Sequence, residues 1–554
     1  MLVQALAPAK LGDFIQASAL IRGVMDANPG AELQVLAVEP GVLEAQRLLF
    51  PEAEGALLGK GALEAGGAGR EPPERGAAEA TGVPRGADLL VNLSVDPRAV
   101  AFAGMLAPKE ILGPRPEGGA VAVPPAQKLA LAAMALDRRL GRLNLVDVWR
   151  ALAPGSPAGL CKPPGAAVPG EAAAGLLEKA GGLPLAFFHP GAAAALRRWP
   201  AEAHAMLAAA LFKTGPFMAV VLGSRRERAL ALKFLAAYGR EAPGAPAEDL
   251  TGQTGLGDLW ALLGKAALLV SSDTGVMHVG ASAGAPQLAV FAGPAYAHET
   301  GPYSGGALVL QGLAPCGPCV EGKGCGRPGC RALPAWEAAL PLAAALLAGE
   351  TPAAAGSGAA GREAARDSGK PAPPPLMAWE SWETRVGPEG ASLEPRGPYP
   401  AALDGRSLAA LLFREGARAL LGLRGRPGKG ETCGRRDAAG RDGSEDAGGG
   451  DGGPGKGDAA GGDVRGDAGG ANEGLGRNMG TGKDDAGGRA EWPGTPTQAA
   501  GELALYVRGR RPDLKKVRAR LSFIEKQALS GPDRRVFRDG WEAVLAEAEG
   551  RGLV

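Results

Sequence analysis

The sequence predicts an α/β protein made of two successive halves, each with a parallel sheet. Two observations lead to this prediction. The chain opens with an apolar run at residues 2–6, a loop containing Pro8 and Gly12, apolar residues at helical spacing, and a second apolar run at 31–38. From residue 184 onward, apolar runs and helix-like stretches alternate again. Because strands that alternate with helices form parallel sheets, each half is expected to contain one.

The elements of the first half follow from its apolar pattern. Residues 14–24 carry apolar side chains near helical spacing, and residues 88–93 (DLLVNL) read as a later strand. Residues 60–85 are rich in glycine, alanine and glutamate, which indicates a loop or an insertion. Proline and glycine cluster at 155–180, where we expect the two halves to join.

The second half shows the same alternation over a longer stretch. The predicted strands are residues 185–189, 217–222, 267–272 and 287–291, and the predicted helices are residues 201–212, 227–238, 275–283 and 336–347.

The composition changes beyond residue 350. Glycine and proline number 89 and 47 among 554 residues, about a quarter of the chain, which is where low-complexity sequence begins. Residues 425–490 contain almost no large apolar residue, so they cannot offset the entropy lost on ordering and are predicted to be disordered. We assign residues 351–497 to a largely disordered linker with one short helix at 407–421, and residues 498–554 to a small helical appendage. A chain ending near residue 350 is therefore expected to fold.

Charge and targeting signals narrow the functional class. The formal net charge of +1 argues against a strongly basic nucleic-acid binder. The first residues show no signal peptide, and the uncharged stretch 275–297 is interrupted by glycine, proline and histidine, so it is not expected to span a membrane. Six cysteines exclude a disulfide-dense scaffold. A cytoplasmic protein is the expectation.

Two motifs place charged residues just after predicted strands. Asp13 follows the first strand, at the edge where parallel sheets bind ligands, although an aspartate here is also a common helix N-cap. In the second half, the small residues of HPGAAAALRRWP precede Arg197 and Arg198, which suits an anion site as well as it suits an ordinary loop with surface arginines.

Two further motifs point to a nucleotide. Glu227 lies shortly after a strand-end glycine, where a carboxylate can accept hydrogen bonds from ribose hydroxyls or simply complement a helix dipole. Asp273, Thr274 and Gly275 lead from a strand into a helix N-terminus, a natural anion site. His278 lies one turn further on and has the alternative of being a core histidine.

Four cysteines are spaced C-x2-C-x5-C-x4-C at Cys316, Cys319, Cys325 and Cys330. Four thiolates can hold zinc, but zinc ribbons usually contain two C-x2-C pairs and this segment has one. Free thiols or a local disulfide together remain the stronger alternative.

Taken in order, these motifs resemble one family, glycosyltransferase family 9, the ADP-heptose–lipopolysaccharide heptosyltransferases. The resemblance extends over residues 1–350 and ends there. The matching segments are LGDFIQ after the first strand, DLLVNLS at 88–94, HPGA…RRWP, LGSRRER, DLTGQTGL at 249–256, SSDTGVMHVGASAGAP, VFAGPA, TGPY at 300–303 and the segment beginning CGPC.

The resemblance implies a GT-B-like fold, with two Rossmann-like domains facing a cleft. Residues 1–165 would form the acceptor-side domain and residues 175–350 the domain that binds the nucleotide sugar. It implies an inverting transferase that requires no cofactor and no metal, with an ADP-heptose-like donor. It also implies a lipid-linked glycan as acceptor, a lipopolysaccharide core or a related surface glycan, and no nucleic-acid partner.

The resemblance also assigns roles to single residues. Asp13 matches the general base. The donor-binding residues would be Arg197 at the diphosphate, Glu227 at the ribose, Thr254 at the adenine, and Asp273, Thr274, Gly275 and His278 around the donor.

This sequence departs from the family pattern at three positions, which leaves the donor open. Ala193 replaces a small hydroxyl residue, Arg197 a lysine and Ala19 a proline. The alternatives are a GT-B transferase for another nucleotide sugar and an inactive glycosyltransferase-like scaffold. The absence of G-x-G-x-x-G after the first strand disfavours a dehydrogenase.

A lipid-linked acceptor suggests weak, peripheral attachment at the inner face of the cytoplasmic membrane. The local candidate is the basic stretch from Arg508 to Arg520, followed by Leu521, Phe523 and Ile524. A solvated helix face is the more common role of such a charge run.

Overall fold

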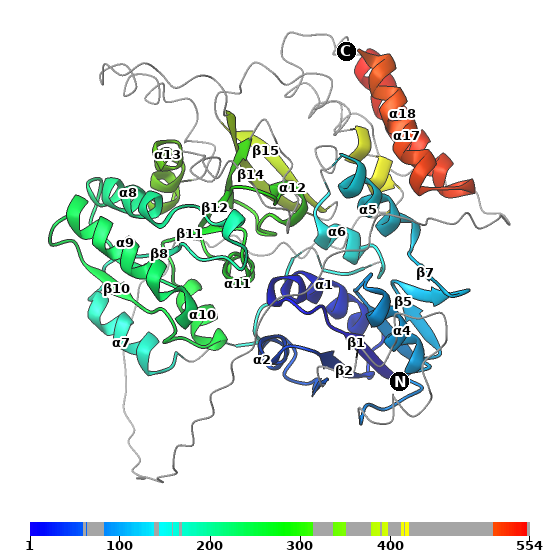
Figure 1. Ribbon diagram of the computed structural model, residues 1–554, viewed down its shortest axis with the longest axis horizontal. Coiled ribbons are helices and arrows are strands. Elements are labelled where there is room, and N and C mark those ends of the chain that lie inside the picture. The colour runs from blue at the N-terminus through cyan, green and yellow to red at the C-terminus, as the bar shows by residue number, and fades with distance from the viewer. Residues whose placement is uncertain are drawn as a thin grey trace. The chain divides into compact units, whose positions relative to one another are not determined.

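The structure is a computed structural model, and it describes two Rossmann-like halves and a pair of C-terminal helices (Figure 1). Residues 1–428 and 486–554 form one compact unit, and residues 429–485 form a second unit that lies outside the described residues. The described residues are 1–58, 63, 82–137, 143–153, 155–157, 159–165, 169–313, 336–350, 378–387, 390–396, 412–414, 416–419, 421 and 513–550.

The first half is built on a five-stranded parallel sheet of order β3-β2-β1-β4-β5. Its strands are β1 (Leu2–Leu6), β2 (Glu32–Ala37), β3 (Glu54–Leu57), β4 (Leu89–Asn92) and β5 (Glu110–Leu112). The helices α1 (Leu11–Ala27), α2 (Pro40–Leu49) and α4 (Pro97–Met105) connect them. β1 is central and almost wholly buried, so the loop after it leads α1 away from the middle of the sheet.

The chain then leaves this sheet through a short hairpin and two helices. These elements are β6 (Arg115–Glu117), β7 (Ala120–Ala122), α5 (Pro125–Asp137) and α6 (Leu145–Arg150). The side chain of Asn144 caps α6 by accepting a hydrogen bond from the Val146 amide. α6 packs against α1.

The second half is built on an eight-stranded sheet of order β10-β9-β8-β11-β12-β13-β14-β15. The first six strands in this order are parallel to one another. β14 is antiparallel to β13, and β15 is antiparallel to β14. The strands are β8 (Leu185–His189), β9 (Met218–Val221), β10 (Ala247–Asp249), β11 (Leu268–Ser272), β12 (Gln287–Phe291), β13 (Leu308–Leu313), β14 (Ala378–Gly387) and β15 (Gly390–Arg396).

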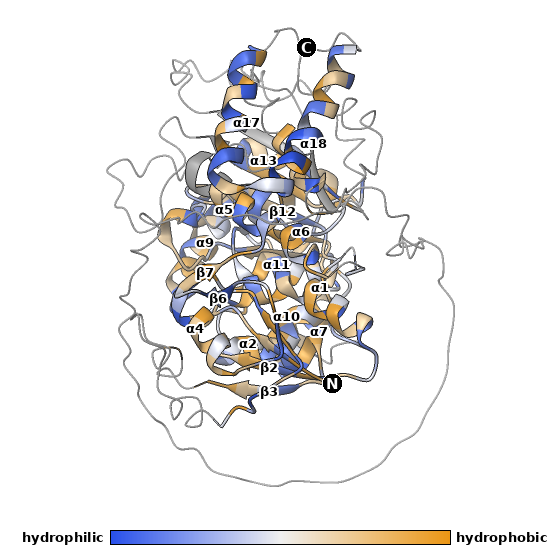
Figure 2. Cartoon of the chain, turned by 90° about the vertical axis from the view of Figure 1, so that its right-hand side faces the viewer, coloured by the Kyte–Doolittle hydropathy of each residue, from blue (hydrophilic) through white to orange (hydrophobic). Residues whose placement is uncertain are grey.

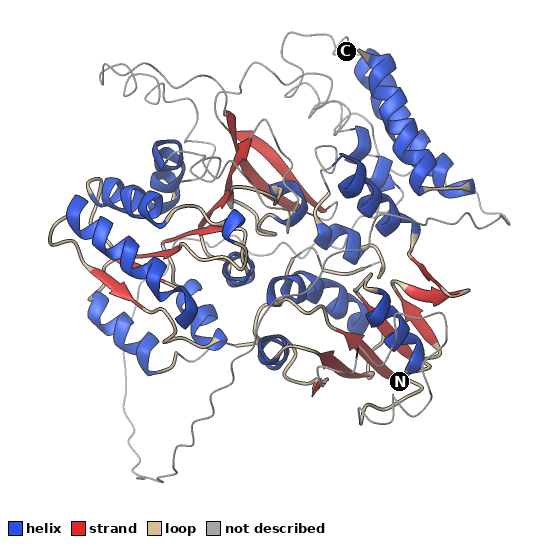
Figure 3. Ribbon diagram, in the orientation of Figure 1, coloured by secondary structure: helices blue, strands red, loops and turns tan. Residues whose placement is uncertain are grey.

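Along the chain, helices alternate with the strands of the second half (Figure 3). They are α7 (Glu171–Ala180), η2 (Ala195–Arg197), α8 (Ala201–Phe212), η3 (Arg225–Glu227), α9 (Arg228–Glu241), α10 (Leu256–Leu263), α11 (Gly275–Ala283), α12 (Ala297–Thr300) and α13 (Trp336–Leu347). Strands β8, β11 and β12 are buried along their whole length, as expected for parallel strands covered on both faces.

The predicted α/β fold is confirmed, since both halves carry a Rossmann-like parallel sheet, which is a GT-B-like arrangement. Residues 425–490, predicted to be disordered, lie outside the described residues. Two strands, β14 and β15, fall inside the segment that the sequence assigned to a linker. β14 pairs with β13 and thereby extends the sheet of the second half beyond residue 350. The domain boundaries themselves stay predictions.

The helical appendage predicted for the C-terminal residues consists of α17 (Leu514–Ala528) and α18 (Gly531–Gly550), and it packs on the first half. Polar and apolar residues alternate along both helices (Figure 2). α17 packs on α5, and one buried apolar cluster joins Leu521 and Trp541 to Leu129, Val148 and Phe413. Part of the apolar surface of residues 1–350 is thus buried by later residues, and the folding of a chain that ends near residue 350 stays a prediction.

Candidate active site

Asp13 lies in the first turn of α1, next to the end of the central strand β1. The N-cap of this helix is Lys10, whose side chain makes no capping hydrogen bond. The N-cap alternative for Asp13 is therefore wrong, although its negative charge still suits the positive end of the helix dipole. Asp13 as a whole residue is exposed to solvent, while the surrounding protein partly desolvates its carboxyl group.

A second helix start, that of α11, follows β11 in the other half. Thr274 is the N-cap of α11, with extended backbone angles (φ −148°, ψ 167°) and no side-chain capping bond. Its Oγ1 instead lies 3.3 Å from Nδ1 of His189. Backbone N–H groups at such a terminus form a ready anion site.

The starts of α1 and α11 are in direct contact. A Cβ on Gly12 would lie 2.8 Å from Cδ2 of His278 and 3.6 Å from Cα of Gly275, so a larger residue would require movement there. Nε2 of the buried Gln16 lies 3.1 Å from Nε2 of His278. Desolvation and the charge of Arg197 lower the pKa of His278 to about 4, so this histidine is neutral at physiological pH.

Arg197 places a positive charge near the contact between the starts of α1 and α11. Its Nη1 lies 3.1 Å from Oδ2 of the buried Asp273, and Thr300 Oγ1 donates to Oδ1 of the same carboxylate at 3.3 Å. Desolvation raises the pKa of Asp13, while the charges of Lys10 and Arg197 oppose that shift. Asp13 and Arg197, from opposite halves of the chain, are thus close enough to interact electrostatically.

Glu227 lies at the end of η3, where it closes a capping box. The amide and the hydroxyl of Ser224 both donate to Oε2 of Glu227, at 2.8 and 2.9 Å. Burial would raise the pKa of Glu227, but the hydrogen bond and charge of His189 and the two hydrogen bonds from Ser224 outweigh it and lower the pKa to about 2. A side chain at Gly191 would displace the Glu227 carboxylate, because a Cβ there would meet Oε1 of Glu227 at 2.0 Å.

Thr254 is half-buried in the turn between β10 and α10. Gly252 of that turn has φ +71° and lies so close to Arg225 that a Cβ would meet its Cγ at 2.2 Å. Arg225 belongs to the same short helix as Glu227, so the turn with Thr254 and the capping box are adjacent.

The four cysteines at 316, 319, 325 and 330 lie outside the described residues. In the part of the chain that the structure describes, no group of three or more histidine, cysteine, aspartate or glutamate residues is arranged to hold a metal ion. Within that same part, none of the helices combines the length and apolar character needed to cross a membrane.

The family comparison covers the middle of the chain. Residues 145–325 match glycosyltransferase family 9 (heptosyltransferase). This stretch is a family 9 glycosyltransferase region. It contains Arg197, Glu227, Thr254 and the start of α11, whereas Asp13 precedes it.

Two curated relatives and two solved structures are also similar to this chain. Lipopolysaccharide heptosyltransferase 2 of Salmonella typhimurium and that of Escherichia coli K12 are each 33% identical to this chain over 129 residues, which are 23% of this chain and 36% of the relative. The chain thus matches little more than a third of the length of these relatives. The structure of E. coli ADP-heptose lipopolysaccharide heptosyltransferase II has a TM-score of 0.46 and 21% identity, covering 63% of this chain and 99% of that one. A family 9 glycosyltransferase from Veillonella parvula has a TM-score of 0.48 and 20% identity, covering 63% and 97%.

Sequence reasoning missed several residues around the family 9 region. Gln16 lies inside the LGDFIQ motif but was given no role, and Thr300 opens the TGPY motif. His189 was noted only as a strand end. The structure places each of them against a predicted site residue. Gln16 contacts His278, and Thr300 contacts Asp273. His189 contacts both Thr274 and Glu227.

Proposed function

We propose that this protein is an inverting glycosyltransferase that moves a heptose-like sugar from an ADP-heptose-like donor to a lipopolysaccharide core or a related surface glycan. One observation carries the proposal. Two helix starts from opposite halves meet, with the Asp13 carboxylate on one side and the Arg197–Asp273 pair on the other. A base facing a diphosphate site is the arrangement that sugar transfer requires.

Asp13 is the proposed general base. The acceptor hydroxyl oxygen forms a bond to the anomeric carbon while the bond from that carbon to the diphosphate oxygen breaks, and the hydroxyl proton passes to Asp13. Because the new bond forms on the face opposite the leaving group, the configuration inverts. A carboxylate whose pKa is raised by desolvation is a better base near neutral pH than an ordinary aspartate.

The leaving nucleoside diphosphate gains negative charge in the transition state. In the proposal, Arg197 and the first N–H groups of α11 stabilise that charge. Asp273 and Thr300 hold the arginine in place, so little reorganisation is needed when the charge develops. Thr274, Gly275 and His278 line the same helix start.

The nucleoside is proposed to bind beside the diphosphate. Glu227, fixed by Ser224 and His189, would accept hydrogen bonds from the ribose hydroxyls, and Thr254 would contact the adenine. The acceptor would be lipid-linked, with weak peripheral contact between the enzyme and the cytoplasmic face of the membrane.

The test is transfer by the purified full-length chain. We expect mass spectrometry to show one added heptose on a heptose-deficient lipopolysaccharide core when ADP-heptose is supplied, and no addition by the Asp13→Asn variant. Transfer from a different nucleotide sugar only would overturn the donor assignment. Binding of ADP without transfer from any donor would favour an inactive scaffold.

A further inference from the structure

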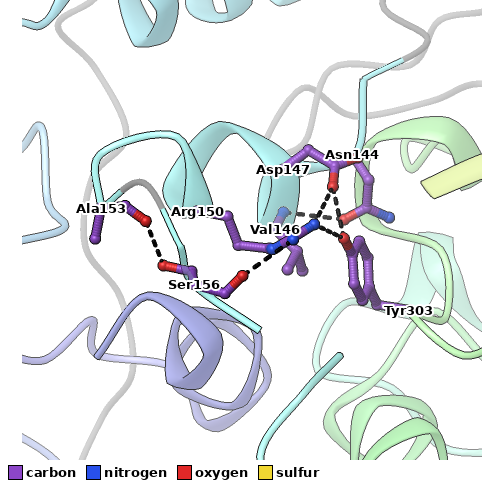
Figure 4. A network of polar contacts seen from close by, with 7 residues as sticks. All are labelled: Asn144, Val146, Asp147, Arg150, Ala153, Ser156 and Tyr303. Carbon is purple, nitrogen blue, oxygen red and sulfur yellow. Dashed lines mark hydrogen bonds and ion pairs between the residues drawn. The ribbon is translucent and has the colours of Figure 1, made fainter. Parts of the chain in front are cut away.

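A buried polar network joins the two halves through residues other than the proposed reacting groups (Figure 4). The hydroxyl of Tyr303 donates to Oδ1 of Asp147 at 2.6 Å and accepts from Nη1 of Arg150 at 2.8 Å. Asp147 and Arg150 lie on α6 of the first half, and Tyr303 follows α12 of the second. All three side chains are buried, at 1%, 6% and 2% exposure.

The same helix holds the segment before Tyr303 at a second point. Nδ2 of Asn144, the N-cap of α6, donates to the carbonyl oxygen of Gly301 at 3.3 Å. Gly301 is itself tightly packed, since a Cβ there would meet the carbonyl oxygen of Ala297 at 2.3 Å. These contacts at Gly301 and Tyr303 together restrain the segment 301–303 relative to α6.

This segment leads directly to the proposed diphosphate site. Thr300 precedes Gly301 and donates to Asp273, which pairs with Arg197. Thr300, Asp273 and Arg197 are thus tied together, so a shift of the segment relative to α6 would move this group as a whole relative to the first half.

At its other end the network is tied to α1. Nη2 of Arg150 donates to the carbonyl oxygen of Ser156 at 3.2 Å. Ser156 packs on Gly23 of α1 so closely that a Cβ at Gly23 would meet its Oγ at 2.0 Å. α1 carries Asp13, so the network connects the helix of the proposed base to the segment that holds the proposed diphosphate cation.

We infer that Tyr303 is a positioning residue, which acts through Asp147 and Arg150 to fix Arg197 relative to Asp13. The inference rests on the proposed function. The desolvation of a buried charged pair offsets much of its attraction, so such a pair is weak evidence for stability, and in this proposal the pair of Asp147 and Arg150 sets the geometry between the halves. Desolvation, together with the charge of Asp147, raises the pKa of Tyr303 well above its usual range, so the hydroxyl keeps the proton that it donates.

The first test separates turnover from nucleotide binding. For Tyr303→Phe in the full-length chain, we expect kcat for heptose transfer to fall by about tenfold or more, because small misplacements of reacting groups have large effects. The Kd for ADP, which needs only the second half, should stay within about twofold of the wild-type value. Asn144→Ser keeps a capping side chain but changes the donor to Gly301, and it should act in the same direction with a smaller effect.

Tyr238→Phe is the matched control. Tyr238 is equally buried, on α9, and its hydroxyl has no hydrogen-bond partner among the described residues. Its loss should leave both kcat and the Kd for ADP unchanged. If Tyr303→Phe lowers kcat no more than Tyr238→Phe, or weakens ADP binding in proportion to kcat, the positioning role is wrong.

A second test does not need activity. Spin labels carried by unnatural amino acids at the exposed positions Arg47 on α2 and Lys233 on α9 report the distance between the halves. We expect a narrow distance distribution in the otherwise wild-type chain and a broader one with Tyr303→Phe. Unchanged distributions would overturn the inference even if transfer is observed. Lack of transfer by the wild-type chain would overturn only the proposed function.

Discussion

Nη1 of Arg197 lies 3.1 Å from Oδ2 of Asp273, directly before the helix start of α11. Asp273 is 6% exposed, and its carboxylate also accepts a hydrogen bond from the hydroxyl of Thr300. The pair is thus both a structural contact and a cation held ready for an anionic ligand. The two roles predict different effects of substitutions, so experiments can distinguish them.

Arg197→Ala is expected to weaken binding of a nucleoside diphosphate sugar by about tenfold to a hundredfold, because hydrogen bonds to charged groups contribute about 1.5–3 kcal/mol. Binding of adenosine should hardly change. Isothermal titration with ADP-heptose and with adenosine measures both. Arg198→Ala is the control, since Nε of Arg198 already donates to the Ala192 carbonyl oxygen. Equal losses for both ligands would contradict the phosphate role, and a larger effect of Arg198→Ala would transfer the role to that residue.

Asp13→Asn is expected to abolish transfer while the Kd for ADP stays unchanged. The pKa of Asp13 is raised, so the folded state favours the protonated form, and ionised Asp13 costs stability above that pKa. The melting temperature at neutral pH should therefore stay constant or rise. Wild-type activity should fall as the pH drops through the pKa of Asp13, because the base must be ionised. A melting temperature that falls in step with activity would indicate a structural role only.

Glu227→Gln tests the ribose contact without removing the capping box, since glutamine also serves at that position. We expect the Kd for ADP to rise by about tenfold, as for a lost charged hydrogen bond. The variant should show no further loss with 2′,3′-dideoxy-ADP, whereas the wild-type chain should lose affinity for that analogue. Additive losses in the variant would mean that Glu227 does not contact the ribose.

Glu227 also makes the stability of the fold depend on pH. Its pKa is lowered from 4.5 to about 2, so its ionisation stabilises the fold above pH 4.5 and that contribution is lost as the pH falls toward 2. The difference in unfolding free energy between wild-type and Glu227→Gln should shrink across this window. Urea unfolding at several pH values measures it, and a constant difference would contradict the assigned pKa.

Local pattern predicted most of the regular elements of the two parallel sheets. The run LVQAL forms β1 at residues 2–6, and the predicted helix 201–212 is α8, because in both places a clear apolar pattern is bounded by proline or glycine. The motifs also located Asp13, Arg197 and Asp273 at strand ends, where parallel sheets expose their loops.

The remainder depends on contacts that no local pattern contains. β14 is a strand because β13 offers an edge more than sixty residues earlier in the chain. Tyr303 reads as an ordinary loop tyrosine until α6 brings Asp147 and Arg150 to its hydroxyl. Lys10, with no capping side-chain bond, takes the N-cap that residue preferences assign to Asp13.

A chain ending at residue 350 is now expected to be destabilised or insoluble. It would lose β14 from the edge of β13 and would expose Leu129 and Val148, which α17 and α18 help to bury. Deletion of residues 429–485, which fall within the stretch that the sequence predicts to be disordered, is the matched control and should leave the melting temperature unchanged. Equal melting temperatures for the two shortened chains would show that the C-terminal helices contribute nothing to the stability of the two halves.

Membrane contact is the last expectation, and the structure changes how it must be tested. Of the apolar residues proposed to reach lipid, Leu521 and Ile524 are buried in the cluster with α5, and only Phe523 is exposed, at 53%. Lys515 and Lys526 are also exposed on α17. Deleting residues 500–554 would expose this apolar cluster, and the chain would then pellet by aggregation whether or not it binds lipid.

Charge reversal on the intact surface avoids that difficulty. Basic residues near anionic lipid contribute about 1 kcal/mol each and are screened by salt, so Lys515→Glu with Lys526→Glu should lower binding to phosphatidylglycerol vesicles by about tenfold or more at low salt. Lys213→Glu with Lys233→Glu makes the same charge change on exposed positions of the second half and should have little effect. Co-sedimentation at low and high salt measures both pairs. If the two double variants pellet equally with vesicles, α17 is a solvated face and the membrane contact lies elsewhere.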